Sequence, residues 1–99
     1  MRARYTQHAR RRLVAIHRFI ALESPDAAEA MLRGLVDHAD SLSSFPRRGR
    51  IVPEYRQADI RELLRPPYRI IYRVDPAEVV VLSVMHGRQL LPDELGSEE

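Results

Sequence analysis

The sequence predicts an α+β domain made of an N-terminal edge strand, an antiparallel helix hairpin and a three-stranded antiparallel meander, in the order β-α-α-β-β-β. Three observations predict this fold. The length of 99 residues makes a single domain by default. Apolar residues recur at helical spacing through the first half of the chain. In the second half they alternate or run continuously, as they do in strands.

The first half of the chain carries the signals of one short strand and two helices. Residues 1–5 form the edge strand, and Thr6 is suited to cap a helix over residues 7–22. Ser24 and the proline after it begin a second helix that extends to about Ser44. Because the gap between the helices is only a few residues long, we expect an antiparallel hairpin. The apolar stripes are Ala9, Leu13, Ile16 and Ile20, then Ala28, Met31, Leu32, Leu35, Val36, Ala39 and Leu42.

The second half of the chain carries the signals of three strands. Pro46 ends the second helix, and residues 47–57 are expected to form a loop. Short turns between consecutive strands indicate antiparallel pairing. The strands are predicted over residues 60–64, 68–74 and 79–85, with turns at Pro66-Pro67 and at residues 75–78.

The pairing of the last two strands decides which side chains share a face of the sheet. If Val74 pairs with Val79, one apolar face covers the helices. The opposite face is then an open face, with an apolar floor edged by two arginines and a histidine. A register slip of one residue would exchange the two faces. The helix-facing set is Tyr68, Ile70, Tyr72, Val74, Val79, Val81, Ser83 and Met85, and the open-face set is Arg69, Ile71, Arg73, Val80, Leu82, Val84 and His86.

The composition excludes several kinds of site. The chain has no cysteine, which excludes a disulfide scaffold, a thiolate metal site and a cysteine nucleophile. His8, His17 and His38 have no further ligand at metal spacing, so we expect no metal and no cofactor. No apolar run approaches the ~20 residues that span a bilayer, and no secretory signal is recognised. We therefore expect a soluble, cytoplasmic protein without a membrane partner.

The charges are unevenly distributed along the chain. The formal net charge is +2, and all sixteen basic residues are arginine. Four of the fourteen acids lie in residues 93–99, so the rest of the chain carries 16 arginines against 10 acids, a charge of +6. A basic body favours an acidic partner, either nucleic acid or an acidic protein segment. A merely solvated basic surface is equally compatible with the charge, and we interpret Arg10, Arg11 and Arg12 in this way.

Short motifs in both halves of the chain occur in the order and at the spacings of a known family. They are Tyr5-Thr6, Pro25 with Ala28, Leu42-x-x-Phe45-Pro46-x-x-Gly49-Arg50, Arg61-Glu62-Leu63, Tyr68-Arg69-Ile70-Ile71-Tyr72-Arg73 and Val84-x-His86-x-Arg88. Over residues 4–92 this series resembles the RelE/ParE superfamily of toxins from type II toxin–antitoxin systems, and it is closest to the ParE branch. We assign residues 1–92 to the toxin domain and residues 93–99 to an acidic tail, which we expect to be disordered.

The resemblance implies a ParE-like toxin that inhibits DNA gyrase, and so replication, and that is neutralised by its cognate antitoxin. RelE-like relatives instead cut mRNA on the ribosome, often with lysines and with a tyrosine after the last strand. This chain has no lysine and no tyrosine at that place, which favours gyrase as the target. A ribosome-dependent mRNA endoribonuclease is the alternative, and a non-toxic or decayed binding module is the second alternative.

No catalytic residue is assigned, but a nuclease would draw on a defined set of side chains. His86 would act as general acid or base, and an arginine would stabilise charge on the phosphate oxygens. The other interpretation of His86 is structural, at the end of a strand. The nuclease candidates are His86, Arg69, Arg88 and Glu54.

Contacts with the target or the antitoxin are expected on the open face. Its arginines are suited to bidentate binding of phosphate or carboxylate, and its apolar floor would otherwise be exposed without purpose. The alternative is a pair of solvated arginines salt-bridged to Glu62. Tyr68 and Tyr72 are interpreted as core aromatics. The candidate contact residues are Arg69, Ile71, Arg73, Leu82, Val84, His86 and Arg88, beside a basic loop of Arg47, Arg48 and Arg50.

The resemblance implies an antitoxin whose C-terminal part wraps the toxin as it folds. A disordered acidic-apolar segment would cover the open face or add a strand to a free sheet edge. Homodimers and toxin–antitoxin hetero-oligomers both remain open at this point, as does the choice between gyrase and the ribosome with its mRNA.

Overall fold

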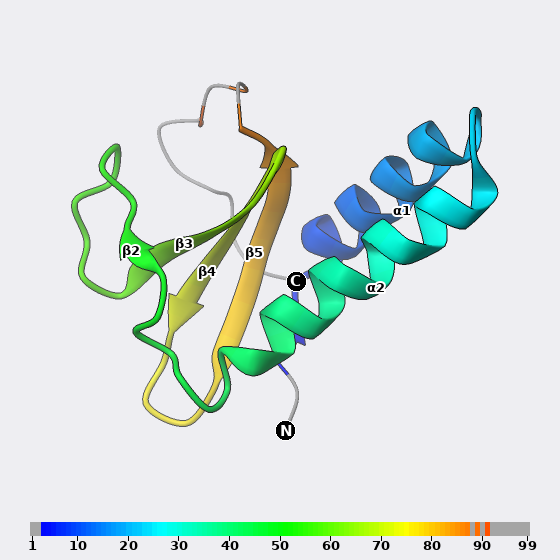
Figure 1. The fold of residues 1–99 in the computed structure, drawn as a ribbon. Coiled ribbons are helices and arrows are strands. Elements are labelled where there is room, and N and C mark those ends of the chain that lie inside the picture. The colour runs from blue at the N-terminus through cyan, green and yellow to red at the C-terminus, as the bar shows by residue number, and fades with distance from the viewer. Residues whose placement is uncertain (1–2, 88, 90, 92–99) are drawn as a thin grey trace.

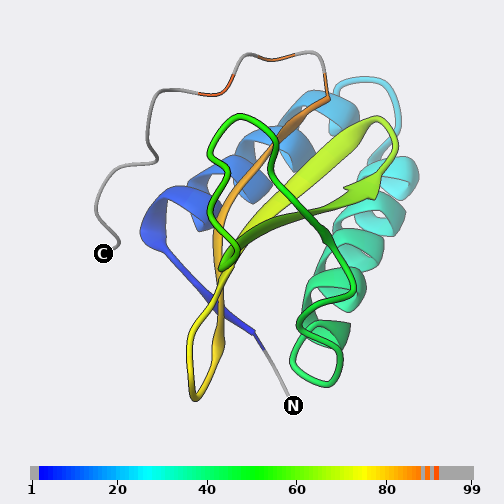
Figure 2. The same ribbon diagram turned by 90° about the vertical axis from the view of Figure 1, so that its left-hand side faces the viewer.

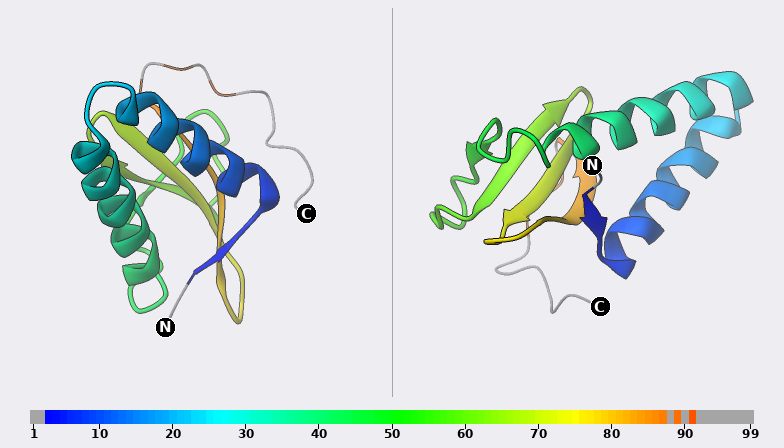
Figure 3. Two further views of the ribbon diagram at one scale, coloured as in Figure 1. Left: turned by 90° about the vertical axis from the view of Figure 1, so that its right-hand side faces the viewer. Right: turned by 90° about the horizontal axis from the view of Figure 1, so that it is seen from below.

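The computed structural model describes residues 3–87, 89 and 91 and confirms the predicted α+β class (Figure 1). Within these residues, two helices lie on one side of a five-stranded sheet (Figure 3). The acidic tail predicted over residues 93–99 lies outside the described residues. The elements are β1 (Arg4–Tyr5), α1 (Gln7–Ala21), α2 (Pro25–Ser41), β2 (Arg50–Ile51), β3 (Ile60–Arg65), β4 (Tyr68–Val74) and β5 (Val79–His86).

Both helices begin where the capping residues predict. The Thr6 hydroxyl accepts a hydrogen bond from the Ala9 N–H at 3.0 Å, and the Ser24 hydroxyl accepts one from the Ala27 N–H at 3.1 Å. α2 ends at Ser41, three residues before the predicted end. The next backbone N–H groups bond to carbonyls three residues earlier, which tightens the chain into a turn. In the part of the chain that the structure describes, no helix is long and apolar enough to cross a membrane.

The strands lie in the order β1-β5-β4-β3-β2 across the sheet. β1 occupies the edge position predicted for it and runs parallel to β5, while β3, β4 and β5 form the predicted antiparallel meander. β2 corrects the prediction of a loop over residues 47–57, because it pairs Arg50 with Glu62 and Ile51 with Arg61. Two residues are too few for a strand pattern to be visible in the sequence.

A β-bulge changes which side chains of β5 face the helices. Val74 pairs with Val79, which confirms the predicted register at the turn. One extra residue is then inserted in β5, so that Ile71 pairs with Ser83. The predicted faces are therefore wrong beyond this point. Val84 packs in the core under the helices and His86 lies beside Tyr68, whereas Met85 packs with Ile71 on the opposite face.

The apolar floor predicted on the open face is not exposed. Ile71, Leu82 and Val84 are only 0%, 7% and 2% exposed. Val84 lies under the helices because of the bulge, and Ile71 is covered by the segment after β2, which crosses in front of the sheet (Figure 2). The prediction of an apolar open face is thus wrong. The second apolar cluster on this side comprises Val52, Ile71 and Met85, with Tyr55, Ile60 and Leu91 packed around them.

Tyr72 holds the segment between α2 and β2 against the sheet. Its side chain is fully buried, as predicted for a core aromatic, and burial raises the pKa of its hydroxyl. The hydroxyl donates a hydrogen bond to the Pro46 carbonyl at 2.7 Å and accepts one from the Gly49 N–H at 2.9 Å. A Cβ at Gly49 would lie 2.6 Å from the Tyr72 hydroxyl oxygen and would clash with the Glu62 carbonyl. Glycine is therefore required where this segment approaches the sheet.

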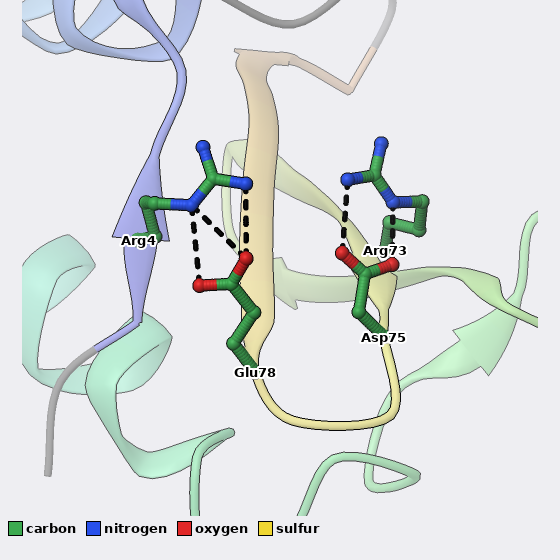
Figure 4. A network of polar contacts seen from close by, with 4 residues as sticks. All are labelled: Arg4, Arg73, Asp75 and Glu78. Carbon is green, nitrogen blue, oxygen red and sulfur yellow. Dashed lines mark hydrogen bonds and ion pairs between the residues drawn. The ribbon is translucent and has the colours of Figure 1, made fainter.

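Two ion pairs fix the turn between β4 and β5 (Figure 4). Arg4 of β1 binds both carboxylate oxygens of Glu78, with its Nε and Nη2 atoms 3.0–3.2 Å from them. Arg73 binds Asp75 in the same bidentate manner, at 2.6 and 3.0 Å. The hydrogen bond from Arg73 lowers the pKa of Asp75. Each strand next to the turn is thus held by a charge-assisted contact.

Candidate functional site on the sheet face opposite the helices

A buried glutamate lies at the centre of this face. The Glu62 side chain is 0% exposed, and its strand position pairs with Ile71. Arg69 Nε donates to Glu62 Oε1 at 2.6 Å, and Arg50 Nε donates to Glu62 Oε2 at 2.5 Å. A carboxylate without solvent contact needs such partners, because an isolated buried charge is costly. The sequence motif Arg61-Glu62-Leu63 therefore contains a structural carboxylate that binds two arginines from other strands.

Arg69 connects Glu62 to a second carboxylate. The Arg69 side chain is 9% exposed, and its Nη2 lies 3.5 Å from Oε1 of Glu54, which is 48% exposed. Burial alone would lower the pKa of Arg69, but the hydrogen bond and charge of Glu62, with those of Glu54, raise it. We call the set Arg50, Glu62, Arg69 and Glu54 the charge network. Its two arginines and two glutamates cancel in formal charge.

Arg73 does not join the charge network. The sequence places Arg69 and Arg73 on one face, two pleats apart, and their pairing with Leu64 and Ile60 of β3 agrees with this. Arg73 is nevertheless held by Asp75 at the turn, not by Glu62. The alternative interpretation from the sequence, an arginine salt-bridged to Glu62, thus describes Arg69 and not Arg73. Both arginines already hold carboxylates, so a new anion must compete for them.

His86 lies on the other side of β5 from the charge network. It pairs with Tyr68, and the two rings meet edge to face with centroids 5.9 Å apart. Its expected position on the open face is wrong, because the bulge reverses the alternation of β5. Among the nuclease candidates, Arg69 and Glu54 meet and His86 does not, while Arg88 lies outside the described residues.

The basic loop does not act as one unit. Arg50 is bound to Glu62, and Arg48 donates from Nη1 to the Ser41 hydroxyl at 3.1 Å. Arg47 is exposed, next to a surface pocket of about 680 Å³ formed with Phe45. The Phe45 side chain is 66% exposed. The sequence marks Phe45 only as the residue before the proline that ends the helix, so its exposure could not be predicted.

The described residues contain no group of three histidine, aspartate or glutamate side chains that could hold a metal ion. His38 is a histidine of α2 with an unusual environment. Its Nδ1 is buried without a hydrogen-bond partner, and burial, together with Arg65 and Arg48, lowers the pKa of the ring. This environment favours the neutral form of the partly buried His38 ring on α2.

The chain is similar to known proteins in sequence and in fold. Residues 3–91 match the family described as "ParE toxin of type II toxin-antitoxin system, parDE". The chain is similar to Toxin RelE2 of Caulobacter vibrioides, with 38% identity over 87 residues that cover 87% of this chain and 94% of the relative. Its fold is similar to that of the chromosomal ParDE TA system from P. aeruginosa, with a TM-score of 0.69 and 24% identity, covering 87% and 95% of the two chains. The toxin–antitoxin complex RelBE2 from Mycobacterium tuberculosis is similar with a TM-score of 0.63 and 30% identity, covering 86% and 95%.

Proposed function

This chain belongs to the ParE toxin family of type II toxin–antitoxin systems, and we propose that it inhibits DNA gyrase, and so replication, in the cytoplasm. Residues 3–91 match the family, and we keep the predicted bounds 1–92 for the toxin domain as part of this proposal. In this proposal the chain acts by binding its target and not by cleaving RNA.

The observation that carries the proposal is the separation of the acid–base groups. General acid–base catalysis needs proton-transferring groups within hydrogen-bond reach of one reacting centre. Among the described residues, Glu54 and Arg69 are in contact, but His86 packs on Tyr68 across the sheet. Arg69 is also bound by Glu62, which occupies the guanidinium that would stabilise a phosphate. This arrangement supports a binding surface better than a nuclease centre.

We also propose a protein antitoxin as partner. The similar RelBE2 structure is that of a toxin–antitoxin complex. The β2–β3 edge offers a place for such a segment, because β2 pairs with only two residues of β3 and leaves Leu63–Arg65 unpaired on that side. Ile51 and Leu64 are exposed apolar side chains near this edge, and the Arg50 side chain is 63% exposed. An acidic-apolar strand fits this edge by β-augmentation.

A RelE-type mRNA endoribonuclease is the second candidate function. The 38% identity to a toxin named RelE2 favours it. The contact between Glu54 and Arg69 would supply a proton carrier next to a cation. In this case His86 would have to reach the substrate from the helix side of β5.

Two assays on the purified full-length chain separate these functions. Inhibition of plasmid supercoiling by gyrase, without cleavage of mRNA on ribosomes, would support the proposal. The reverse result would replace it with the RelE-type activity, and His86→Ala should then slow cleavage about 10²-fold or more. Leu22→Ala is the matched control, because Leu22 is 83% exposed at the tip of the helix hairpin.

Induced expression tests the same proposal in cells. Gyrase inhibition predicts filamentation with an induced DNA-damage response, and co-expression of the antitoxin encoded next to the toxin should relieve both. Rapid arrest of protein synthesis without that response would contradict gyrase as the target. Normal growth would leave the non-toxic binding module as the function.

A further inference from the structure

The outer face of α1 and the adjoining β1 form a groove that the proposed function does not use. Its volume is about 740 Å³. Four of its lining residues recur at positions 7, 11, 14 and 18, a single stripe along the exposed side of the helix. Arg4 and Tyr5 of β1 also line the groove. β1 directly precedes α1 and lies next to its start (Figure 3). The lining residues are Arg4, Tyr5, Gln7, Arg10, Arg11, Val14, Ala15 and Arg18.

The groove is basic, and no acidic residue lines it. Four of its eight lining residues are arginines, of which Arg4 is already bound to the Glu78 carboxylate. α1 has no acidic residue along its fifteen positions. The side chains of Arg10, Arg11 and Arg18 make no hydrogen bond or ion pair within the described chain. Arg12, by contrast, faces the sheet and donates to the Val84 carbonyl. The fold thus uses one arginine of α1 for structure and leaves three available.

We propose that this groove binds the phosphate backbone of duplex DNA. The choice of duplex DNA as the source of phosphate rests on the proposed action on gyrase, an enzyme whose substrate is DNA. A polyanion gains most from arginines that need not break existing pairs, since each contact releases a counterion from the nucleic acid. The interpretation of Arg10–Arg12 as a solvated helix face is replaced by this proposal for Arg10 and Arg11.

The spacing of the arginines fits a backbone better than an acidic protein helix. Arg11 and Arg18 lie seven residues apart, about 10 Å along α1 at ~1.5 Å per residue. One DNA strand presents a phosphate every ~3.4 Å along the duplex axis, so this distance corresponds to about three nucleotides. A docked amphipathic helix would need a row of apolar anchors. Val14 is the one large, exposed hydrophobic residue among the described lining residues.

The test measures binding of a 20-base-pair duplex to the full-length chain by fluorescence anisotropy at several salt concentrations. The variant is Arg11→Ala/Arg18→Ala. The control, Arg33→Ala/Arg56→Ala, removes the same charge from two exposed arginines outside the groove. We expect the groove variant to lose at least ten-fold in affinity at low salt and the control to stay within three-fold. The plot of log affinity against log salt has a negative slope. Its magnitude should decrease by about 2 in the groove variant, since each lost phosphate contact removes ~0.9 from it.

Three results would overturn the proposal. One is the absence of duplex binding when the wild-type chain is added to the labelled duplex in up to 100-fold molar excess. The second is an equal loss of affinity in both double variants. The third is displacement of the DNA by polyglutamate of matched charge or by duplex RNA at lower concentration, which would assign the groove to an acidic protein or to RNA.

Gyrase supercoiling on the same proteins keeps this proposal separate from the proposed function. Duplex binding through the groove without gyrase inhibition would retain the DNA site and reject gyrase as the target. Gyrase inhibition by a wild-type chain that binds no duplex would retain the target and reject the groove. Loss of both duplex binding and gyrase inhibition in Arg11→Ala/Arg18→Ala, but not in the control, would support both.

Discussion

Replacing Glu62 with alanine tests whether the charge network stabilises the fold. Glu62 is fully buried and accepts from Arg69 and Arg50. In the variant Arg69 would stay buried, with the 3.5 Å contact to the half-exposed Glu54 as its remaining ion pair in the network. A buried charge that loses its buried partner costs about 3–5 kcal/mol. The remaining contact with Glu54 is half-exposed and screened, so it offsets only about 0–1 kcal/mol of this cost, and the lost bond to the exposed Arg50 adds about 0–1 kcal/mol. We expect Glu62→Ala to lower the free energy of unfolding by about 3–5 kcal/mol, a large share of the ~5–15 kcal/mol typical of a domain.

The assay is urea unfolding of the purified chain at neutral pH, followed by far-ultraviolet circular dichroism. The control Arg50→Ala should cost about 1 kcal/mol or less, because the Arg50 side chain is mostly in solvent. The double variant Glu62→Leu/Arg69→Met should recover most of the loss, since it removes both buried charges together. A cost below about 1 kcal/mol for Glu62→Ala, or a double variant as unstable as the single one, would refute the reasoning.

Three further predictions concern hydrogen bonding and pH. Tyr72→Phe removes a donor to Pro46 and an acceptor for Gly49, so we expect a loss of about 1–3 kcal/mol in the same urea assay, and unchanged stability would contradict the role of the hydroxyl. His38 has a folded pKa below the ordinary value of 6.5, so its contribution to stability is present above that pH and is lost as the pH falls below it. The free energy of unfolding, measured between pH 7 and pH 5, should therefore depend less on pH in His38→Gln than in the wild-type chain. If both proteins show the same pH dependence, His38 is not the cause of it. Asp75 has a folded pKa below 3.8, so its contribution is present above that pH and is lost during further acidification, and Arg73→Gln should remove this loss. Acid unfolding identical to that of the wild-type chain would rule out the Arg73 contact as the cause.

Local patterns predict the elements of this fold well. Thr6 and Ser24 mark the two helix starts, and alternation with short turns gives the strands of the meander. The register Val74–Val79 also follows from the sequence, because a short turn fixes the pairing next to it. The predictions that fail concern contacts between residues far apart in the sequence. The β2 strand exists through its pairing with β3, and no pattern within its two residues indicates that pairing.

The candidate site is predicted less well, because burial depends on features that the sequence does not mark. Alternation places Ile71 on the face opposite the helices, and this is confirmed, but nothing in it shows that Val52 covers that face. The bulge in β5 moves Val84 and His86 to the helix side. The sequence pattern does not reveal the structural role of Glu62. Alternation places Glu62 on the same face as Arg69, but it does not show that Arg50 lies on the neighbouring strand and binds the same carboxylate.

The distribution of paired and unpaired arginines changes where an anionic ligand is expected to bind. At the sheet face a ligand must displace Glu62 from Arg69 or Asp75 from Arg73, and it loses those charge-assisted bonds as it forms its own. On α1 a ligand meets Arg11 and Arg18, which hold nothing within the described chain, so its cost is limited to desolvation and side-chain ordering. The alternation of the strands predicts the sheet face as the anion site, and the pairing of the side chains favours α1 instead. An antitoxin bound at the β2–β3 edge would then leave the α1 groove open, so the toxin–antitoxin complex should keep its affinity for duplex DNA while losing its action on gyrase.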